Sequence, residues 1–213
     1  MVERATGAEE KRRIILDAAV RVFARRGFHA SRVSDIAKEA GVAHGLLYHY
    51  FSSKDEVLET IFREEWADLL GEIDGVERSD APARDQLQRV AARLLGSWRR
   101  HPDVVRVIVR EIARSPEVQE RIGELVKPIE AIQRIIANGQ ERGEFRGDFD
   151  PRLAGILFYG GIEEMLSGWV LGQIPDRDDV VAGAERMLVD VFCAGFLAPA
   201  EQLGEARDAD IPA

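Results

Sequence analysis

A glycine between two short helical patterns, within residues 27–54, constrains the fold of this chain more than any other feature. The first pattern, 33–40, has a single apolar stripe formed by Val33, Ile36, Ala37 and Ala40. Gly41 follows it, and glycine adopts the left-handed conformation of a tight turn at little cost. A second pattern covers 44–51. Two short helices joined in this way predict a helix-turn-helix, whose second helix enters the major groove of DNA.

The second helix is predicted to present a polar face to DNA. Leu47 and Phe51 lie four residues apart and can anchor this helix on the preceding one. The outward positions are then His44, Gly45, Tyr48 and His49. The aromatic run 48–50 also fits packing beneath the first helix, but only one of three successive helical positions can point firmly inward. At least one of these side chains is therefore expected to be exposed.

Charge is distributed unevenly along the chain. The net charge of −9, taken alone, argues against a nucleic-acid partner, because DNA binding depends on neutralising phosphates. Residues 11–54, however, hold nine Lys or Arg and three Asp or Glu, a balance of +6, whereas the rest of the chain has a balance of −15. A basic N-terminal module on an acidic body is expected when only one end of the molecule approaches DNA.

Several classes of protein are excluded by what the sequence lacks. Its longest apolar run, 154–162, has nine residues, whereas a bilayer-spanning helix needs about 20. Residues 1–10 carry three glutamates and no apolar core of a signal peptide, so we expect a cytoplasmic protein with no membrane partner. The single Cys193 allows no internal disulfide. No two of the four histidines form a metal-binding pair four residues apart, so we predict no metal, no cofactor and no catalytic residue.

The remaining pattern is helical throughout and predicts an all-α fold. Apolar spacing predicts about nine helices, over 10–26, 33–40, 44–51, 54–75, 82–100, 102–114, 116–142, 151–172 and 177–198. Four prolines suit helix starts, because proline is tolerated in a first turn: Pro82, Pro102, Pro116 and Pro151. Pro128 falls inside the pattern 116–142, where it predicts a kink or a break.

Two domains and a tail are expected. Ser53 can cap the helix 54–75, and Glu56 can return the hydrogen bond, so this start is well defined. We therefore predict a DNA-binding domain over 1–53 and a helical ligand-binding and dimerisation domain over 54–200, with the helix 54–75 connecting them. Residues 201–213 are polar and are expected to form a loose tail.

Residues 10–60 resemble the TetR family of bacterial transcriptional regulators. The resemblance lies in the arginine-rich first helix, Gly27-Phe28, Val33-Ser34-Asp35-Ile36-Ala37, Ala40-Gly41-Val42, Gly45, Leu47-Tyr48-His49-Tyr50-Phe51 and Lys54. It implies an all-helical homodimer with a three-helix DNA-binding head, a connecting fourth helix, and a body that holds a ligand cavity. It also implies that the last two long helices form the dimer interface as a four-helix bundle.

The resemblance assigns roles to individual residues. Phosphates would be held by four residues with donor groups suited to this role: Ser31, Arg32, Tyr50 and Lys54. The base edges or the floor of the groove would be met by His44, Gly45, Leu46, Tyr48 and His49. Ala43 and Leu46 depart from the family pattern, which often has Ser or Thr at the first position and Thr at the second. Leu46 can still contact a thymine methyl group.

Residues 143–170 are similar to the corresponding stretch of the fatty-acid-degradation repressors of this family. Their effector is a long-chain acyl-coenzyme A, which needs an apolar tunnel and several cations. Arg106, Arg110 and Arg114 recur at four-residue spacing and are predicted to bind the phosphates, although this spacing also fits a solvated basic face. Large apolar side chains are predicted to line the cavity, although core packing fits them too: Trp98, Met165 and Trp169.

These observations predict a homodimeric repressor that binds a pseudo-palindromic operator and is released by a small-molecule effector, with long-chain acyl-coenzyme A as the first choice. One alternative is a TetR-type regulator of an efflux or other metabolic operon with a different apolar effector. The other is a non-regulatory architectural DNA-binding protein, which would need basic charge beyond the first 54 residues. An enzyme is disfavoured, because no phosphate-binding loop or catalytic constellation is present.

Overall fold

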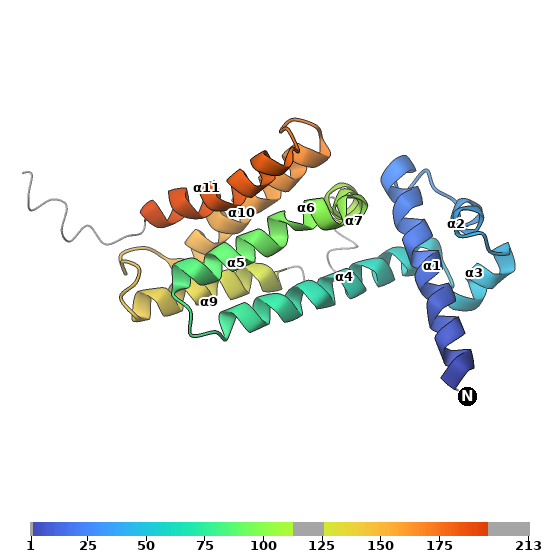
Figure 1. The fold of residues 1–213 in the computed structure, drawn as a ribbon, viewed down its shortest axis with the longest axis horizontal. Coiled ribbons are helices and arrows are strands. Elements are labelled where there is room, and N and C mark those ends of the chain that lie inside the picture. The colour runs from blue at the N-terminus through green and yellow to red at the C-terminus, as the bar shows by residue number, and fades with distance from the viewer. Residues whose placement is uncertain (1, 113–125, 196–213) are drawn as a thin grey trace, which may run out of the picture.

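The computed structural model describes residues 2–112 and 126–195, and these residues form helices and connecting loops without a strand (Figure 1). The all-α prediction is confirmed. A head of three helices is followed by the long helix α4, which runs from the head into the body. The head and α4 comprise α1 (Val2–Arg26), α2 (Val33–Ala40), α3 (His44–Tyr50) and α4 (Lys54–Glu77). The body adds α5 (Ala83–Leu95), α6 (Ser97–Arg100), α7 (Pro102–Val107), the π-helical turn η1 (Ile108–Ile112), α9 (Lys127–Glu141), α10 (Pro151–Val170) and α11 (Asp178–Ala194).

The head has its own apolar core. One face of α1 is buried against α2, α3 and the start of α4, and its largest buried side chain is Phe23. Ile14, beside the buried Ile15 on α1, is 40% exposed. Val107, from the end of α7, is also buried in this core. The body therefore contributes a side chain to the packing of the head.

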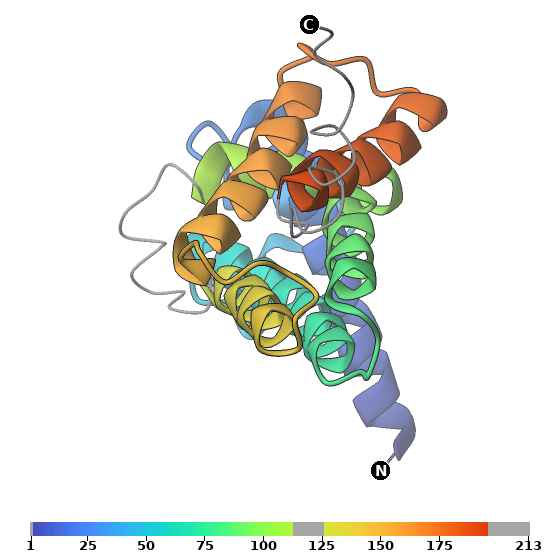
Figure 2. The same ribbon diagram turned by 90° about the vertical axis from the view of Figure 1, so that its left-hand side faces the viewer.

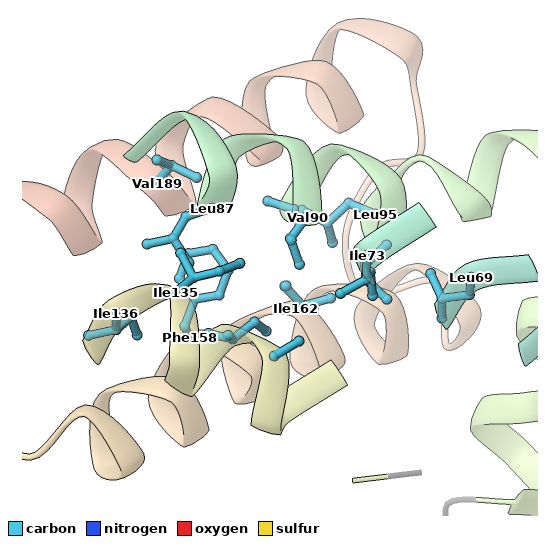
Figure 3. Close-up of a cluster of buried hydrophobic side chains, with 14 of the residues drawn as sticks. Leu69, Ile73, Leu87, Val90, Leu95, Ile135, Ile136, Phe158, Ile162 and Val189 are labelled. Atoms are coloured by element: carbon cyan, nitrogen blue, oxygen red, sulfur yellow. The ribbon is translucent and has the colours of Figure 1, made fainter. Parts of the chain in front are cut away.

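A second and larger core fills the body between α4, α5, α9, α10 and α11 (Figure 3). Its members include Leu87, Ile135 and Phe158, which meet between α5, α9 and α10. Gly155 allows α10 to approach α9, because a Cβ atom there would lie 2.5 Å from Cγ of Gln133. Figures 1 and 2 show α11 on the side of the body away from α4.

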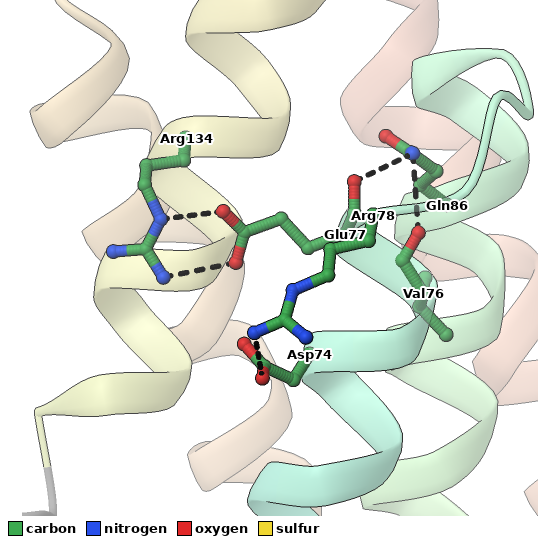
Figure 4. A network of polar contacts seen from close by, with 6 residues as sticks. All are labelled: Asp74, Val76, Glu77, Arg78, Gln86 and Arg134. Atoms are coloured by element: carbon green, nitrogen blue, oxygen red, sulfur yellow. Dashed lines mark hydrogen bonds and ion pairs between the residues drawn. The ribbon is translucent and has the colours of Figure 1, made fainter.

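The body end of α4 is fixed by polar contacts (Figure 4). Glu77 receives two hydrogen bonds from Arg134 of α9, at 2.6 and 2.9 Å. Nε2 of Gln86, on α5, donates to the carbonyl groups of Val76 and Ser79 at 3.1 and 2.7 Å. Because one end of α4 is held in the body and the other packs in the head, α4 can transmit movement between them.

Three predicted helices differ from those observed. The pattern 82–100 forms two helices, because the first ends at Gly96. The pattern 102–114 becomes α7 followed by a π-helical turn, and residues 113–114 lie outside the described ranges. Of the kink or break predicted at Pro128, the structure has a helix start: α9 begins at Lys127, so this proline lies in its first turn, where no partner for a backbone N–H is needed. Residues 116–125 of the predicted helix lie outside the described ranges.

The first helix starts earlier than predicted, because α1 begins at Val2 and not at residue 10. The predicted loose tail, 201–213, lies outside the described residues. Among the residues that the structure describes, no helix is long and apolar enough to cross a membrane.

Candidate nucleic-acid interface and ligand cavity

The outer face of α3 carries the side chains that the sequence predicts for base recognition. His44, Gly45 and His49 are exposed, and Tyr48 is 51% exposed. The rings of His44 and Tyr48 meet edge to face with 5.2 Å between their centroids. Leu47 is fully buried on the opposite side of the helix. The geometry thus presents a short polar and aromatic face to solvent.

The turn between α2 and α3 has the geometry that Gly41 was predicted to provide. The φ angle of Gly41 is +67°, in the left-handed region. The N–H of Val42 donates to the carbonyl of Ala37 at 3.0 Å, which closes the end of α2. Ala43 is the N-cap residue of α3, and because its side chain is apolar it makes no capping hydrogen bond.

Leu46 and Tyr50 are half-buried rather than fully on the outer face. Tyr50 packs against the core of the head, and its ring contacts that of His49 with 5.3 Å between centroids. Within the aromatic run, then, the innermost position is Tyr50, while Tyr48 and His49 face solvent.

The structure gives Ser31 and Lys54 partners within the head. The Ser31 side chain is buried, and its hydroxyl donates to the carbonyl of Gly27 at 2.6 Å. Nζ of Lys54 donates to the carbonyls of Phe28 and Ser31 at 2.7 and 3.0 Å and lies 4.2 Å from the centre of the Phe28 ring. Both groups therefore fix the turn between α1 and α2, and these bonds use the hydroxyl donor of Ser31 and two of the three ammonium donors of Lys54.

Four arginines of the head are paired with carboxylates: Arg12, Arg21, Arg25 and Arg26. Arg21 and Arg25 both contact Glu39, and they hold the pKa of Glu39 below its ordinary value, Arg25 most strongly. Arg26 contacts Asp35 at 2.9 Å. Within the described head, Arg32 and Lys38 are exposed and have no ion pair, and the same holds for Lys11 and Arg13 on α1. Lys38 was missed in the sequence, although its position two residues after Ile36 places it on the solvent side of α2.

These placements give an expected result for phosphate binding. Lys38→Ala and Arg32→Ala should each weaken binding to all DNA sequences and reduce the slope of log affinity against log salt by about one unit. Lys54→Ala should leave that slope unchanged, because the ammonium group is already bonded within the head. Fluorescence anisotropy over 50–300 mM salt measures the three slopes. A reduced slope for Lys54→Ala alone would contradict this assignment.

The body contains a cavity of about 610 Å³. Its wall is mainly apolar and is contributed by α4, α5, α7, η1, α9 and α10, with Trp66, Leu69, Leu94, Val104, Val105, Ile108, Val109, Val126, Ile129, Ile162 and Leu166. Its volume lies within the usual range of small-molecule sites, about 300–1,000 Å³. The cavity is therefore large enough for an apolar ligand of considerable length.

Polar groups occupy a smaller part of the cavity wall. Burial raises the pKa of Glu163, and burial together with the charge of Glu163 raises the pKa of Tyr159. Arg93 and His101 line the cavity and also a neighbouring surface hollow that contains Arg100. The apolar space thus borders a polar surface at Arg93 and His101.

The side chains predicted to line the cavity lie elsewhere. Trp98 and Trp169 are buried and stack on each other, with 6.4 Å between ring centroids, and Met165 packs against the body core. The cavity wall includes none of these three described side chains, so the core alternative describes them better. Sequence spacing could not separate the two, since both need apolar side chains on the inner face of a helix.

Arg106 and Arg110 are likewise not part of the cavity wall. Arg106 pairs with Asp103 at 2.7 Å and lies over the ring of Trp98, with 4.9 Å from the guanidinium carbon to the ring centroid. Arg110 donates to the carbonyl of Ala24 in the head at 3.4 Å. Arg114 lies outside the described residues. The cavity cation that sequence reasoning missed is Arg93, which only the tertiary fold brings to the wall.

Family comparisons match this architecture over most of the chain. Residues 15–61 match the family described as bacterial regulatory proteins, tetR family, and residues 62–188 match the YsiA-like protein, C-terminal region. The chain belongs to the TetR family. The boundary between the two matches falls within α4, which joins the head to the body.

Similar proteins include a regulator of fatty acid metabolism and a transcriptional repressor. The chain is 31% identical, over 176 residues, to the fatty acid metabolism regulator protein of Bacillus subtilis, covering 82% of this chain and 90% of that protein. It is 29% identical to the transcriptional repressor KstR2 of Rhodococcus jostii, covering 70% and 74%.

Two solved structures share the fold. FadR from Bacillus subtilis in complex with stearoyl-CoA has a TM-score of 0.76 and 29% identity, covering 85% of this chain and 97% of that chain. The fatty acid degradation regulator FadR from Bacillus halodurans has a TM-score of 0.77 and 26% identity, covering 87% and 95%. These relatives are regulators, so this TetR-family chain is a ligand-responsive transcriptional repressor and not an enzyme.

Proposed function

We propose that the chain is a homodimeric repressor whose effector is a long-chain acyl-coenzyme A. The observation that carries this proposal is the apolar cavity of about 610 Å³ in the body. The stearoyl-CoA in the similar Bacillus subtilis FadR structure supports the same class of ligand. The acyl chain would occupy the apolar part of the cavity, and Arg93 and His101 mark where the wall becomes polar.

Burial of the acyl chain contributes a large share of the binding free energy. Each methylene group removed from water contributes about 0.8 kcal/mol, so ten buried groups contribute about 8 kcal/mol before the costs of association. A micromolar dissociation constant needs a net free energy of about 8 kcal/mol, so the costs of association have to be offset by further buried methylene groups and by contacts of the headgroup. Shorter chains lose this contribution step by step, so chain length is expected to determine potency.

The homodimer is supported by an exposed apolar face on α10 and α11. This face, the α10–α11 face, consists of Leu153, Ile156 and Leu157 on α10 and of Met187 and Val191 on α11, all of them exposed. Leu157 and Val191 are 70% and 71% exposed. Soluble monomers rarely expose large contiguous apolar patches, so this face suits a second copy of the chain. Two heads would then meet half-sites about 34 Å apart on DNA.

Release of the operator follows from unequal affinity of the effector for two arrangements of the heads. A ligand that bound both arrangements equally would shift neither population. An effector in the cavity contacts α4, and the first residues of α4 pack in the head. The effector is therefore expected to favour a spacing of the heads that no longer fits two successive major grooves.

The test is a titration of the protein–operator complex with acyl thioesters of increasing length. Stearoyl-CoA is expected to weaken operator binding by about 5- to 150-fold, the usual range of allosteric coupling, whereas octanoyl-CoA and free coenzyme A should have little effect. Equal release by free stearate would favour an apolar effector that is not a thioester. A complex that survives all long-chain thioesters would refute the proposed effector.

A further inference from the structure

The π-helical turn η1 lies between the ligand cavity and the DNA-binding head. Ile108 and Val109, in this turn, line the cavity. Val107, immediately before the turn, is buried in the core of the head. Figure 1 shows α7, which leads into the turn, beside α1. Three consecutive residues therefore contact both the effector space and the head.

Two hydrogen bonds cross from this turn to the end of α1. Oε1 of Glu111 accepts from the backbone N–H of Phe28 at 3.1 Å. Nη1 of Arg110 donates to the carbonyl of Ala24 at 3.4 Å. Gly27, next to Phe28, has a φ of +80°, in the left-handed region that favours glycine.

The backbone of Phe28 is the meeting point of three elements. Its N–H is held by Glu111 of η1, and its carbonyl accepts from Lys54, the first residue of α4. A movement of Glu111 would therefore displace the Phe28 backbone, and with it the end of α1 and the first residue of α4. The body end of α4 is fixed by Arg134, so a change at Phe28 would alter the angle of the head rather than the position of the whole helix.

A π-helical turn can change the rotational position of residues around the helix axis. It contains one residue more per hydrogen-bonded turn than an α-helix, and such turns occur mainly as single insertions, often at functional sites. Conversion to the α form would shift the following residues by one position, a rotation of about 100° around the helix axis. Arg110 and Glu111 would then lose their partners at the end of α1.

We propose that Glu111, held on Phe28 through the π-helical turn 108–112, is the positioning residue that couples the occupancy of the cavity to the orientation of the head. An occupant pressing on Ile108 and Val109 changes the turn, and the change breaks the Glu111–Phe28 bond. This inference rests on the proposed function insofar as the effector occupies this cavity. It adds the residue and the turn through which the response reaches DNA.

The first test uses a matched pair of variants and one probe, stearoyl-CoA. Glu111→Gln keeps a carbonyl acceptor for the Phe28 N–H, whereas Glu111→Ala removes it. The weakening of operator binding by the probe should persist within about threefold in Glu111→Gln and fall below about twofold in Glu111→Ala. A full response of Glu111→Ala would overturn the proposal. Two controls accompany Glu111→Ala. Its circular dichroism should match that of the wild type, and the Phe28 amide should exchange its hydrogen faster than in the wild type, because its hydrogen bond to Glu111 is missing.

The second test needs no ligand and so separates the coupling from the identity of the effector. Val109→Trp fills part of the cavity from its wall. It should weaken operator binding about tenfold or more in the wild-type background and by less than about twofold when combined with Glu111→Ala, a non-additive result. Equal weakening in both backgrounds, or none in the wild type, would overturn the proposal. If Val109→Trp loses helical circular dichroism, Val109→Phe replaces it.

If stearoyl-CoA leaves the wild-type complex intact, the proposed effector is refuted while the Val109 comparison still decides the role of Glu111. If the thioester acts on the wild type and on Glu111→Ala equally, the effector is supported and the Glu111 coupling is refuted. The two proposals can therefore fail separately.

Discussion

Replacing Leu47 with alanine is expected to lower operator affinity by at least about thirtyfold. Leu47 is fully buried beneath α3, and truncating a buried leucine to alanine costs about 2–5 kcal/mol, where each 1.4 kcal/mol is tenfold. The helix α3 has only seven residues, and so short a helix is not stable without tertiary packing. Its recognition face would therefore lose its fixed orientation. Anisotropy with operator DNA measures the affinity.

Leu46→Ala is the matched control for this substitution. It removes the same number of atoms from the neighbouring position, which is half-buried. It should leave the thermal midpoint of the head almost unchanged and reduce affinity only through lost contact with the groove. If both variants bound with equal affinity, Leu47 would not be the anchor of α3.

The helix-turn-helix could be predicted because its signals are local. Apolar spacing over 33–40 and a glycine at position 41 determine where α2 ends and how α3 departs, and both were found where expected. The start of α4 is similar, since Ser53 accepts from the N–H of Glu56 at 3.0 Å. The return bond differs by one residue, because Glu56 accepts from Ser52 rather than from Ser53.

The roles of Ser31 and Lys54 could not be predicted from residue type alone. Both side chains are able to bind phosphate, but in the fold each lies beside free backbone carbonyls at the turn after α1. In the free protein these donors bind the backbone carbonyls of the turn, because buried carbonyl groups need a hydrogen-bond partner whether or not a DNA phosphate is present. Sequence gives the chemistry of a donor and not its neighbours.

The lining of the cavity depends on tertiary packing, and sequence patterns say little about it. Arg93 comes from α5 and Glu163 from α10, and nothing in their spacing connects them. Trp98 and Trp169 attract attention as large side chains, yet they stack on each other in the core. The π-helical turn was not predicted, because a single extra residue changes the apolar periodicity too little to be separated from that of an α-helix.

Leu157→Asp is expected to convert the protein to a monomer and to remove detectable operator binding at nanomolar concentrations. Leu157 is 70% exposed in the single chain, so the substitution should not disturb the fold of the protomer. In a two-fold symmetric interface every substitution occurs twice, and two unpaired carboxylates would be buried against the opposing α10–α11 face. A monomer contacts one half-site and loses the gain from simultaneous binding of two heads.

Sedimentation velocity and operator anisotropy on the same samples test this expectation. Ala81→Asp adds the same charge in the turn between α4 and α5, outside α10 and α11, and should remain dimeric. Two outcomes would contradict the prediction. A Leu157→Asp protein that is monomeric but still binds the full operator tightly would show that the heads act independently. A protein that remains dimeric would place the interface elsewhere, because no stable interface accepts two unpaired buried charges at its centre.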